Sequence, residues 1–138
     1  MREYKFRGKI IDHRTRFIKT LGYKVGDWIY GENISTEHDD IEPDKINVFI
    51  CGIRVNPDTV GQYTGVKDFK ENPVYEYDVL VDQGLDEDME KDYGTVYWSE
   101  ECARFLIGFN LNPEMDAYDA RYYTVVGNVW DNPELTEN

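Results

Sequence analysis

Side chains able to bind a metal ion gather in two acidic stretches. Residues 86–92 (DEDMEKD) alternate carboxylates like the early positions of a calcium-binding EF-hand loop. The sixth position is Lys91, where such a loop requires glycine, and the twelfth is Tyr97, where it requires a bidentate glutamate. Residues 38–40 (HDD) resemble the His-Asp pair of metal-dependent phosphohydrolases, but His13 is the only other histidine. Surface loops are therefore favoured over metal sites at both places.

Signatures of covalent or nucleotide chemistry are missing from the sequence. Neither Ser35 nor Ser99 lies in a G-x-S-x-G motif, and neither a P-loop nor G-x-G-x-x-G occurs. Cys51 and Cys102 form no C-x-x-C pair, and two glutamates precede Cys102 and oppose formation of its thiolate. We expect a non-enzymatic protein with no catalytic residues, metal or cofactor. The enzymatic alternative, metal-dependent hydrolysis through clustered carboxylates, would require ligands from residues 32–44 and 83–93 to converge.

The densest set of hydrogen-bonding side chains lies between and beyond two turn glycines, Gly61 and Gly65. Loops on a β scaffold often carry function, so these side chains are candidate interaction residues: Gln62, Tyr63, Lys67 and Asp68. The structural alternative is that the glycines enforce a turn, while the tyrosine packs and the lysine pairs with an acid.

The net charge of -13 is distributed unevenly. Residues 1–24 hold eight Lys or Arg against only Glu3 and Asp12. Such a basic segment is attracted to the acidic body of its own chain or of another copy, which predicts a homo-oligomer. Alternatively, the segment contacts nucleic acid through residues such as Arg7 and Arg14, or the acidic face mimics nucleic acid and binds a basic protein.

Composition indicates a folded, non-membrane protein. The 138 residues are 41% hydrophobic and include three Trp, eleven Tyr and six Phe, which excludes a disordered chain. No apolar run approaches the roughly 18 residues of a membrane span, and residues 1–7 lack the apolar stretch of a signal peptide. We expect a soluble protein inside the cell.

At least six short strands are predicted from alternating or β-branched patterns bounded by turn residues. They cover residues 4–10, 25–31, 46–55, 74–82, 94–98 with 104–109, and 122–130. Residues 32–44 are predicted to be a loop, and residues 59–68 a helical turn or a tight loop. Asn112 and Pro113 have the chemistry of a helix start.

This pattern predicts a predominantly β fold on the border of α+β, an antiparallel small barrel or sandwich with few short helices. The chain forms a single domain, or two subdomains at 1–56 and 57–138. In that division a barrel-like unit covers residues 57–130.

Six blocks, in order along nearly the whole chain, resemble the YopX family of phage and prophage proteins. They are residues 5–9 (KFRGK), 26–31 (GDWIYG), 59–68 (TVGQYTGVKD), 74–79 (VYEYDV), 94–98 (GTVYW) and 126–135 (VGNVWDNPEL). Family members usually show an Asn-Gly turn and an E-G-D-I-V strand near residues 69–79. Here Asn72 precedes proline, and Tyr77 stands in place of the glycine.

The resemblance implies a mainly β or α+β fold of phage origin with no assigned activity, and it transfers no catalytic residue. Together with the residue patterns, it leads us to expect a phage accessory protein that binds a partner and self-associates in the cytoplasm of a bacterial host cell. A nucleic-acid-associated module and an acidic nucleic-acid mimic that binds a host or phage protein remain alternative hypotheses.

Overall fold

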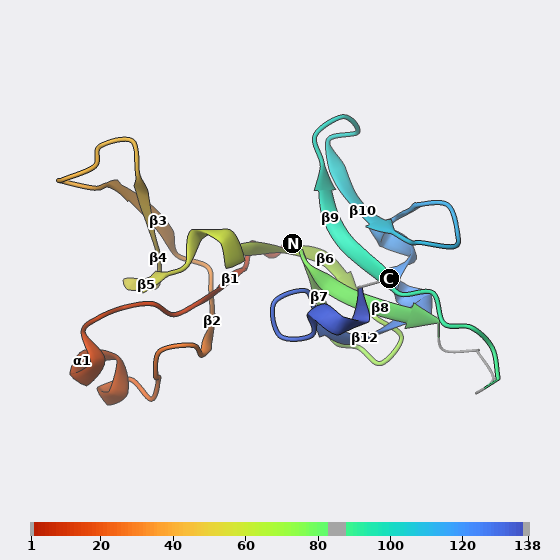
Figure 1. The fold of residues 1–138 in the computed structure, drawn as a ribbon, viewed down its shortest axis with the longest axis horizontal. Helices are drawn as coiled ribbons and strands as arrows, with labels where there is room; N and C mark the ends of the chain where they lie inside the picture. Colours follow the sequence, from red (N-terminus) through yellow and green to blue (C-terminus); the bar gives the residue numbers. More distant parts are fainter. Residues whose placement is uncertain (1, 83–87, 137–138) are drawn as a thin grey trace. The chain divides into compact units, whose positions relative to one another are not determined.

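The computed structural model describes residues 2–82 and 88–136. The chain divides into two compact units, Met1–Gln62 and Tyr63–Asn138. Its strands pair antiparallel in three sheets, and the longest helical segments have six residues (Figure 1). The predicted class, predominantly β and antiparallel with few short helices, is confirmed. The barrel-like unit expected at residues 57–130 is corrected, because no sheet of the described strands closes into a barrel.

The first unit contains two antiparallel strand groups. Strand β1 (Phe6–Lys9) pairs with β2 (Trp28–Gly31), and its first two residues also pair with the start of β6 (Gly61–Lys67). A three-stranded meander follows, made of β3 (Ile34–His38), β4 (Ile46–Ile50) and β5 (Ile53–Val55). A 3-10 helix, η1 (Pro57–Thr59), precedes β6.

The core of the first unit also receives a side chain from a short helix. Helix α1 (Thr15–Thr20) contributes Ile18, and strands or their flanks contribute the other fully buried residues Ile10, Ile29, Ile50, Ile53 and Val55. This helix was not predicted, because six residues are too few to display a helical repeat of apolar positions. No helix among the described residues has the length and apolar character needed to cross a membrane.

Two predictions in the first unit were wrong. Residues 46–55 form a hairpin and not one strand, because Cys51 and Gly52 adopt φ of 50° and 79° and reverse the chain. Positive φ at both central residues is what a tight type I′ hairpin turn requires. Strand β3 lies in the predicted loop at 32–44; its exposed polar residues give no apolar alternation.

The second unit is built on a five-stranded sheet with the order β11-β10-β9-β8-β12. These strands are β8 (Asp78–Asp82), β9 (Gly94–Ser99), β10 (Arg104–Gly108), β11 (Met115–Asp116) and β12 (Tyr123–Asn128). Strand β6 continues into this unit, where Tyr63 pairs with Tyr75 of β7 (Pro73–Tyr75). Two 3-10 helices complete the unit, η2 (Ala117–Tyr122) and η3 (Pro133–Leu135). Its core consists of Val74, Leu80, Val96, Ile107 and Ala120.

Three local predictions in this unit are corrected. Residues 74–82 form two strands, because Tyr77 adopts φ of 72° and ends the first strand in a turn. Residues 61–67 form strand β6 and not a helical turn or loop, with a register shift around Gly65, whose φ is 86°. The helix predicted at Asn112 begins later, where the Asp116 carboxylate accepts a hydrogen bond of 2.8 Å from the Tyr118 amide.

Candidate functional site

A cavity of about 600 Å³ opens in the second unit, between β6 with its following loop and the 3-10 helix η2. The first segment lines it with Tyr63, Lys67, Asp68 and Phe69. The 3-10 helix and its end supply Tyr118, Arg121 and Tyr122. We refer to these seven residues as the aromatic–basic groove.

The loop after β6 is fixed by the buried carboxylate of Asp68, which is 2% exposed. One oxygen accepts hydrogen bonds from the amides of Lys70 (2.9 Å) and Asn72 (2.8 Å). The other accepts from the amide of Val125 in β12 at 2.9 Å and from the Asn72 side chain at 3.3 Å. All these donors belong to the protein, so Asp68 positions the loop and does not face a ligand.

Arg121 is held in place by its two tyrosine neighbours. Its guanidinium carbon lies 3.6 Å from the ring centroid of Tyr118 and 4.9 Å from that of Tyr122. Its Nε donates to the Tyr118 carbonyl at 3.1 Å, and its Nη2 donates to the Tyr122 hydroxyl at 3.0 Å. These contacts order a long side chain before any ligand arrives.

Three aromatic side chains of the groove are more than half exposed: Phe69 at 62%, Tyr118 at 57% and Tyr122 at 59%. Tyr63, in contrast, is 8% exposed, and its ring centroid lies 5.6 Å from that of Tyr75. Tyr63 therefore forms the floor of the groove, while the three exposed rings offer contact area. Exposed aromatic clusters of this kind are characteristic of binding surfaces.

Basic side chains are concentrated at the groove, although the second unit as a whole is acidic. Residues 63–138 contain five Lys or Arg and eighteen Asp or Glu. Two of the five basic residues, Lys67 and Arg121, line the groove, and Lys70 lies in its loop. None of these three forms an ion pair with a carboxylate of the described residues, whereas Arg104 pairs with Asp116 at 3.6 Å.

The structure brings together three of the predicted interaction residues, Tyr63, Lys67 and Asp68. Gln62 belongs to the first unit and pairs with Phe6 across β6 and β1. The residues on η2 that complete the groove were missed by sequence reasoning. Their signal was the dense sequence of residues 118–122 (YDARY), in which two tyrosines flank one arginine within five positions.

The two arginines considered for nucleic acid are engaged within the first unit. Arg7 is 5% exposed, and its guanidinium carbon lies 4.7 Å from the ring centroid of Trp28. Arg14 donates to both oxygens of Asp12 and to the Gly52 carbonyl. Arg7 is therefore buried, and two nitrogens of Arg14 already donate within the protein, whereas Lys67 is exposed and forms no ion pair among the described residues.

One acid of each acidic motif, Asp39 and Asp92, accepts hydrogen bonds from backbone amides. No group of three or more His, Cys, Asp or Glu suited to a metal ion occurs within residues 2–82 and 88–136. The start of the calcium-like stretch, residues 86–87, lies outside the described part. Asp39 accepts hydrogen bonds from the amides of Glu42 and Ile41, and these bonds lower the pKa of its carboxyl group. Residues 38–40 therefore shape the turn between β3 and β4.

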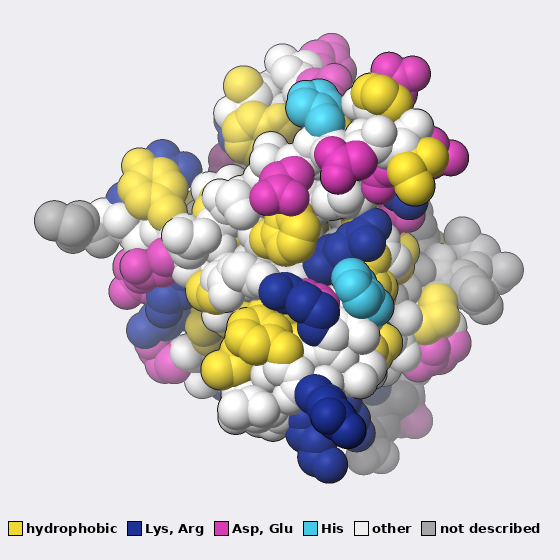
Figure 2. All heavy atoms as spheres, turned by 90° about the vertical axis from the view of Figure 1, so that its left-hand side faces the viewer, with side chains coloured by type: hydrophobic (Ala, Val, Ile, Leu, Met, Phe, Trp, Pro, Cys, Tyr) yellow, Lys and Arg dark blue, Asp and Glu magenta, His cyan; other side chains and the backbone are white. Residues whose placement is uncertain are grey.

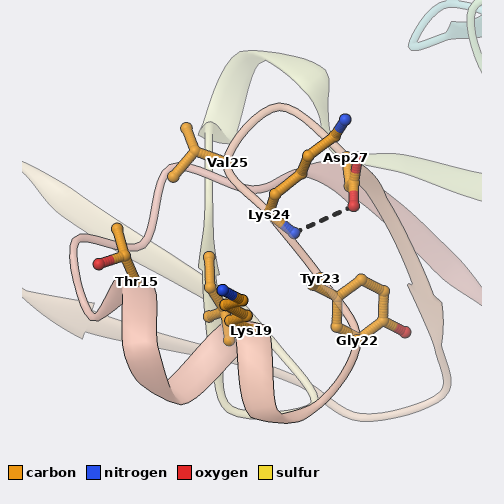
Figure 3. Close-up of a pocket in the computed structure, with 8 residues that line it drawn as sticks. Thr15, Lys19, Gly22, Tyr23, Lys24, Val25 and Asp27 are labelled. Carbon is orange, nitrogen blue, oxygen red and sulfur yellow. Dashed lines mark hydrogen bonds between the residues drawn. The ribbon is translucent and has the colours of Figure 1, made fainter.

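A second hollow, of about 730 Å³, lies in the first unit beside α1 (Figure 3). Lys19 from the helix and Lys24 from the turn after it contribute to its lining, with Tyr23 and Val25. The Lys24 amide donates to the Asp27 carboxylate at 3.0 Å, which fixes this turn (Figure 3). The ammonium groups of both lysines lack an ion-pair partner among the described residues.

The first unit is electrically polarised although it carries no net formal charge. It contains ten basic and ten acidic residues, with eight of the basic ones before residue 25 and eight of the acidic ones after residue 24. Figure 2 shows the outcome on one face, where acidic side chains gather in the upper part and Lys and Arg side chains in the lower part. The acidic end includes the β3–β4 hairpin, and the basic end includes α1.

The fold and site define a small antiparallel β protein with an open groove of aromatic and basic side chains. The chain belongs to the YopX family, because the family model described as "YopX protein" matches residues 5–137. This confirms the resemblance seen in the sequence blocks, and membership indicates a phage-type protein.

Among solved structures, the chain is similar to protein EF1440 from Enterococcus faecalis, with a TM-score of 0.59 and 20% sequence identity. The match covers 99% of this chain and 100% of that one. At this identity the similarity shows the fold alone. No curated protein matches the chain.

Proposed function

We propose that this protein is a non-enzymatic binding protein of a phage or prophage and that the aromatic–basic groove is its binding surface. The observation that carries the proposal is the cluster of three exposed rings, Phe69, Tyr118 and Tyr122, beside the cations Lys67 and Arg121. Aromatic residues and arginine are the types enriched in binding hot spots, since they supply large contact areas.

The order already present in the groove favours binding. Asp68 holds one wall to β12, and Arg121 is held by hydrogen bonds to Tyr118 and Tyr122. Ordering loose side chains on association costs roughly 0.5–1.5 kcal/mol for each one. A groove that is ordered in advance avoids most of that cost.

The test is capture of partners from a lysate of the bacterial host by tagged protein. The double variant Phe69→Ala/Tyr122→Ala removes two exposed rings, and Tyr4→Ala removes an exposed ring of the first unit as a matched control. We expect a bound species that the wild type and the control retain and the double variant loses. Equal recovery by all three proteins would refute the groove as the binding surface.

Self-association is a second candidate, favoured by the polarised first unit. The basic hollow with Lys19 and Lys24 in one copy complements the acidic β3–β4 hairpin of another, which carries Glu37, Asp40 and Glu42. Because the two contacting surfaces differ, the contact is head to tail and generates rings or chains of copies.

Sedimentation at low and high salt tests this second candidate. We expect copies to associate at low salt and to separate at high salt, because exposed charges are screened beyond a Debye length of about 8 Å at physiological salt. Lys19→Glu/Lys24→Glu should abolish association, and mixing that variant with Glu37→Lys/Glu42→Lys should restore association, now in assemblies that contain both variants. A wild-type monomer at both salt concentrations would rule the contact out.

A further inference from the structure

We infer that the aromatic–basic groove binds single-stranded nucleic acid, with bases stacked on Phe69 and Tyr122 and phosphates held by Lys67 and Arg121. This inference rests on the proposed function and names the ligand class of the same groove. It differs from the sequence-based alternative, which assigned nucleic acid to the basic segment at residues 1–24.

The charged side chains of the groove determine which sign of charge a ligand must carry. In a unit with eighteen acidic residues, cations without ion-pair partners among the described residues are concentrated at Lys67, Lys70 and Arg121. The Nη1 group of Arg121 takes part in neither hydrogen bond to the tyrosines, so its donors are left for an anion. Asp68 and Glu71 are the acids of the lining, and the Asp68 oxygens already accept backbone amides. The groove therefore suits an anionic ligand.

The exposed rings of the groove, placed beside its cations, indicate the shape of the ligand. Phe69 and Tyr122 expose ring surface beside the cations, and Arg121 covers part of the Tyr118 ring. A nucleotide joins a flat ring to a phosphate over a short distance, whereas the Asp and Glu side chains of an acidic peptide carry no ring. Stacking of bases on aromatic side chains beside a positively charged track is how proteins bind single strands. The volume of about 600 Å³ also lies within the range of roughly 300–1,000 Å³ of small-molecule pockets, which suits a nucleotide-sized segment.

A nucleic-acid duplex is not the preferred ligand of the groove. Base faces in a duplex are stacked on one another and are not available to Phe69 or Tyr122. The second unit carries thirteen more acidic than basic residues, so an extended polyanion is repelled outside the groove. We expect a preference for short single strands, with little dependence on base sequence.

The experiment measures fluorescence anisotropy of labelled oligonucleotides of about ten nucleotides, a length within the site sizes of known single-strand binders. Single-stranded DNA, single-stranded RNA and duplex DNA are titrated with the full chain. We expect at least one of the two single strands to bind, and comparison of their affinities shows whether the groove prefers DNA or RNA. With about two phosphates contacted, raising salt from 50 to 200 mM should weaken binding roughly sevenfold.

Variants separate the groove from general charge effects. Tyr122→Ala should weaken binding about tenfold, the scale of one lost stacking contact, whereas Tyr122→Phe keeps the ring, loses only the hydrogen bond from Arg121, and should weaken binding much less. Lys67→Ala should weaken binding and flatten the salt dependence, while Lys91→Ala, the same charge change outside the groove lining, should not. Glu71→Gln should tighten binding, because it removes the exposed carboxylate of the lining.

The outcomes distinguish this inference from the proposed function. If no oligonucleotide binds at low salt but the groove captures an acidic protein from the lysate, nucleic acid is not the ligand. The proposal that the groove is a binding surface would then still hold. Oligonucleotide binding that is insensitive to Tyr122→Ala and Lys67→Ala but lost in Arg16→Ala/Lys24→Ala would place nucleic acid on the basic segment and overturn the inference. Neither binding nor capture would overturn both proposals.

Discussion

The carboxylate of Asp68 accepts a hydrogen bond of 2.9 Å from the amide of Val125, a residue 57 positions further along the chain. This contact ties the groove loop to strand β12, beside the hydrogen bond of 2.8 Å from the Phe69 amide to the Tyr123 carbonyl. The backbone that carries the exposed ring of Phe69 is therefore attached to β12 by two neighbouring hydrogen bonds, one at residue 68 and one at residue 69.

Asp68→Asn should lower the free energy of unfolding by about 1–3 kcal/mol, because an amide group replaces one carboxylate oxygen and leaves buried amide donors without an acceptor. Urea unfolding followed by tryptophan fluorescence measures the loss. Lys70→Ala, which changes an exposed side chain of the same loop and keeps its backbone amide, is the control and should be nearly neutral. An Asp68→Asn protein as stable as the wild type would contradict the anchoring role.

At Tyr77, substitution by glycine should destabilise the protein less than substitution by alanine, the reverse of the usual order. Its φ of 72° lies in the left-handed region, which costs a non-glycine residue about 1–2 kcal/mol, while its ring meets Trp130 edge-on with centroids 5.7 Å apart. Tyr77→Ala loses the ring contact and keeps the strain, whereas Tyr77→Gly loses the contact and relieves the strain. We expect glycine to be the more stable of the two by about 1 kcal/mol, measured by urea unfolding. At a residue with negative φ, the alanine variant would be the more stable of the two. If Tyr77→Ala proves more stable than Tyr77→Gly, the backbone at residue 77 is not strained.

Gly94 should not tolerate a side chain. A Cβ at this position would lie 2.6 Å from Ile107 Cγ2 and 2.6 Å from Phe109 Cε1, inside a packed core. We expect Gly94→Ala to destabilise the protein by about 1–3 kcal/mol, the usual cost of overpacking. Gly108→Ala on the neighbouring strand is the matched control, since the nearest atom to its Cβ would be Tyr97 Cε1 at 3.3 Å. Equal melting temperatures for the two variants would argue against close packing at Gly94.

Asp12 should make the first unit sensitive to acid. Hydrogen bonds from Arg14 and from the Arg54 amide hold the pKa of this buried carboxyl well below its usual value, despite the opposing effect of burial. Because the folded-state pKa is lowered, this stabilisation is fully present above the unfolded pKa of about 3.9 and is lost as the pH falls below it. Asp12→Asn should therefore lose stability at pH 7 and show a smaller further loss between about pH 4 and pH 2.

The measurement is urea unfolding of wild type and Asp12→Asn at a series of pH values. Asp58→Asn, an exposed acid of the same unit without this arginine contact, serves as the control and should follow the wild-type pH profile. Parallel pH profiles for wild type and Asp12→Asn would show that the carboxylate does not contribute through its ionisation.

The sequence predicted strands well where apolar alternation was uninterrupted. The expected hairpin of residues 94–98 and 104–109 corresponds to β9 and β10, because the alternation ends at a polar turn. Prediction was wrong where reversal depends on a residue that seldom adopts positive φ, as at Cys51 and Tyr77. It also missed β3, since an exposed polar strand is defined by its pairing with β4 and not by its own composition.

The candidate site could be predicted only by half. Lys67 and Asp68 were indicated by dense polar chemistry near glycines, but Tyr118 and Arg121 reach the same groove through tertiary packing. Whether a residue faces a ligand also depends on contacts that a sequence does not reveal. Asp68 is turned inward by four donors, and the guanidinium of Arg7 lies over Trp28.

The two cysteines, both exposed and unoxidised, fall one in each compact unit, Cys51 in the first and Cys102 in the second. Thiol-reactive spin labels or fluorophores will therefore attach at one point per unit in the unaltered protein. The distance between the two probes, measured by spectroscopy, shows whether the separation of the units changes when an oligonucleotide is added.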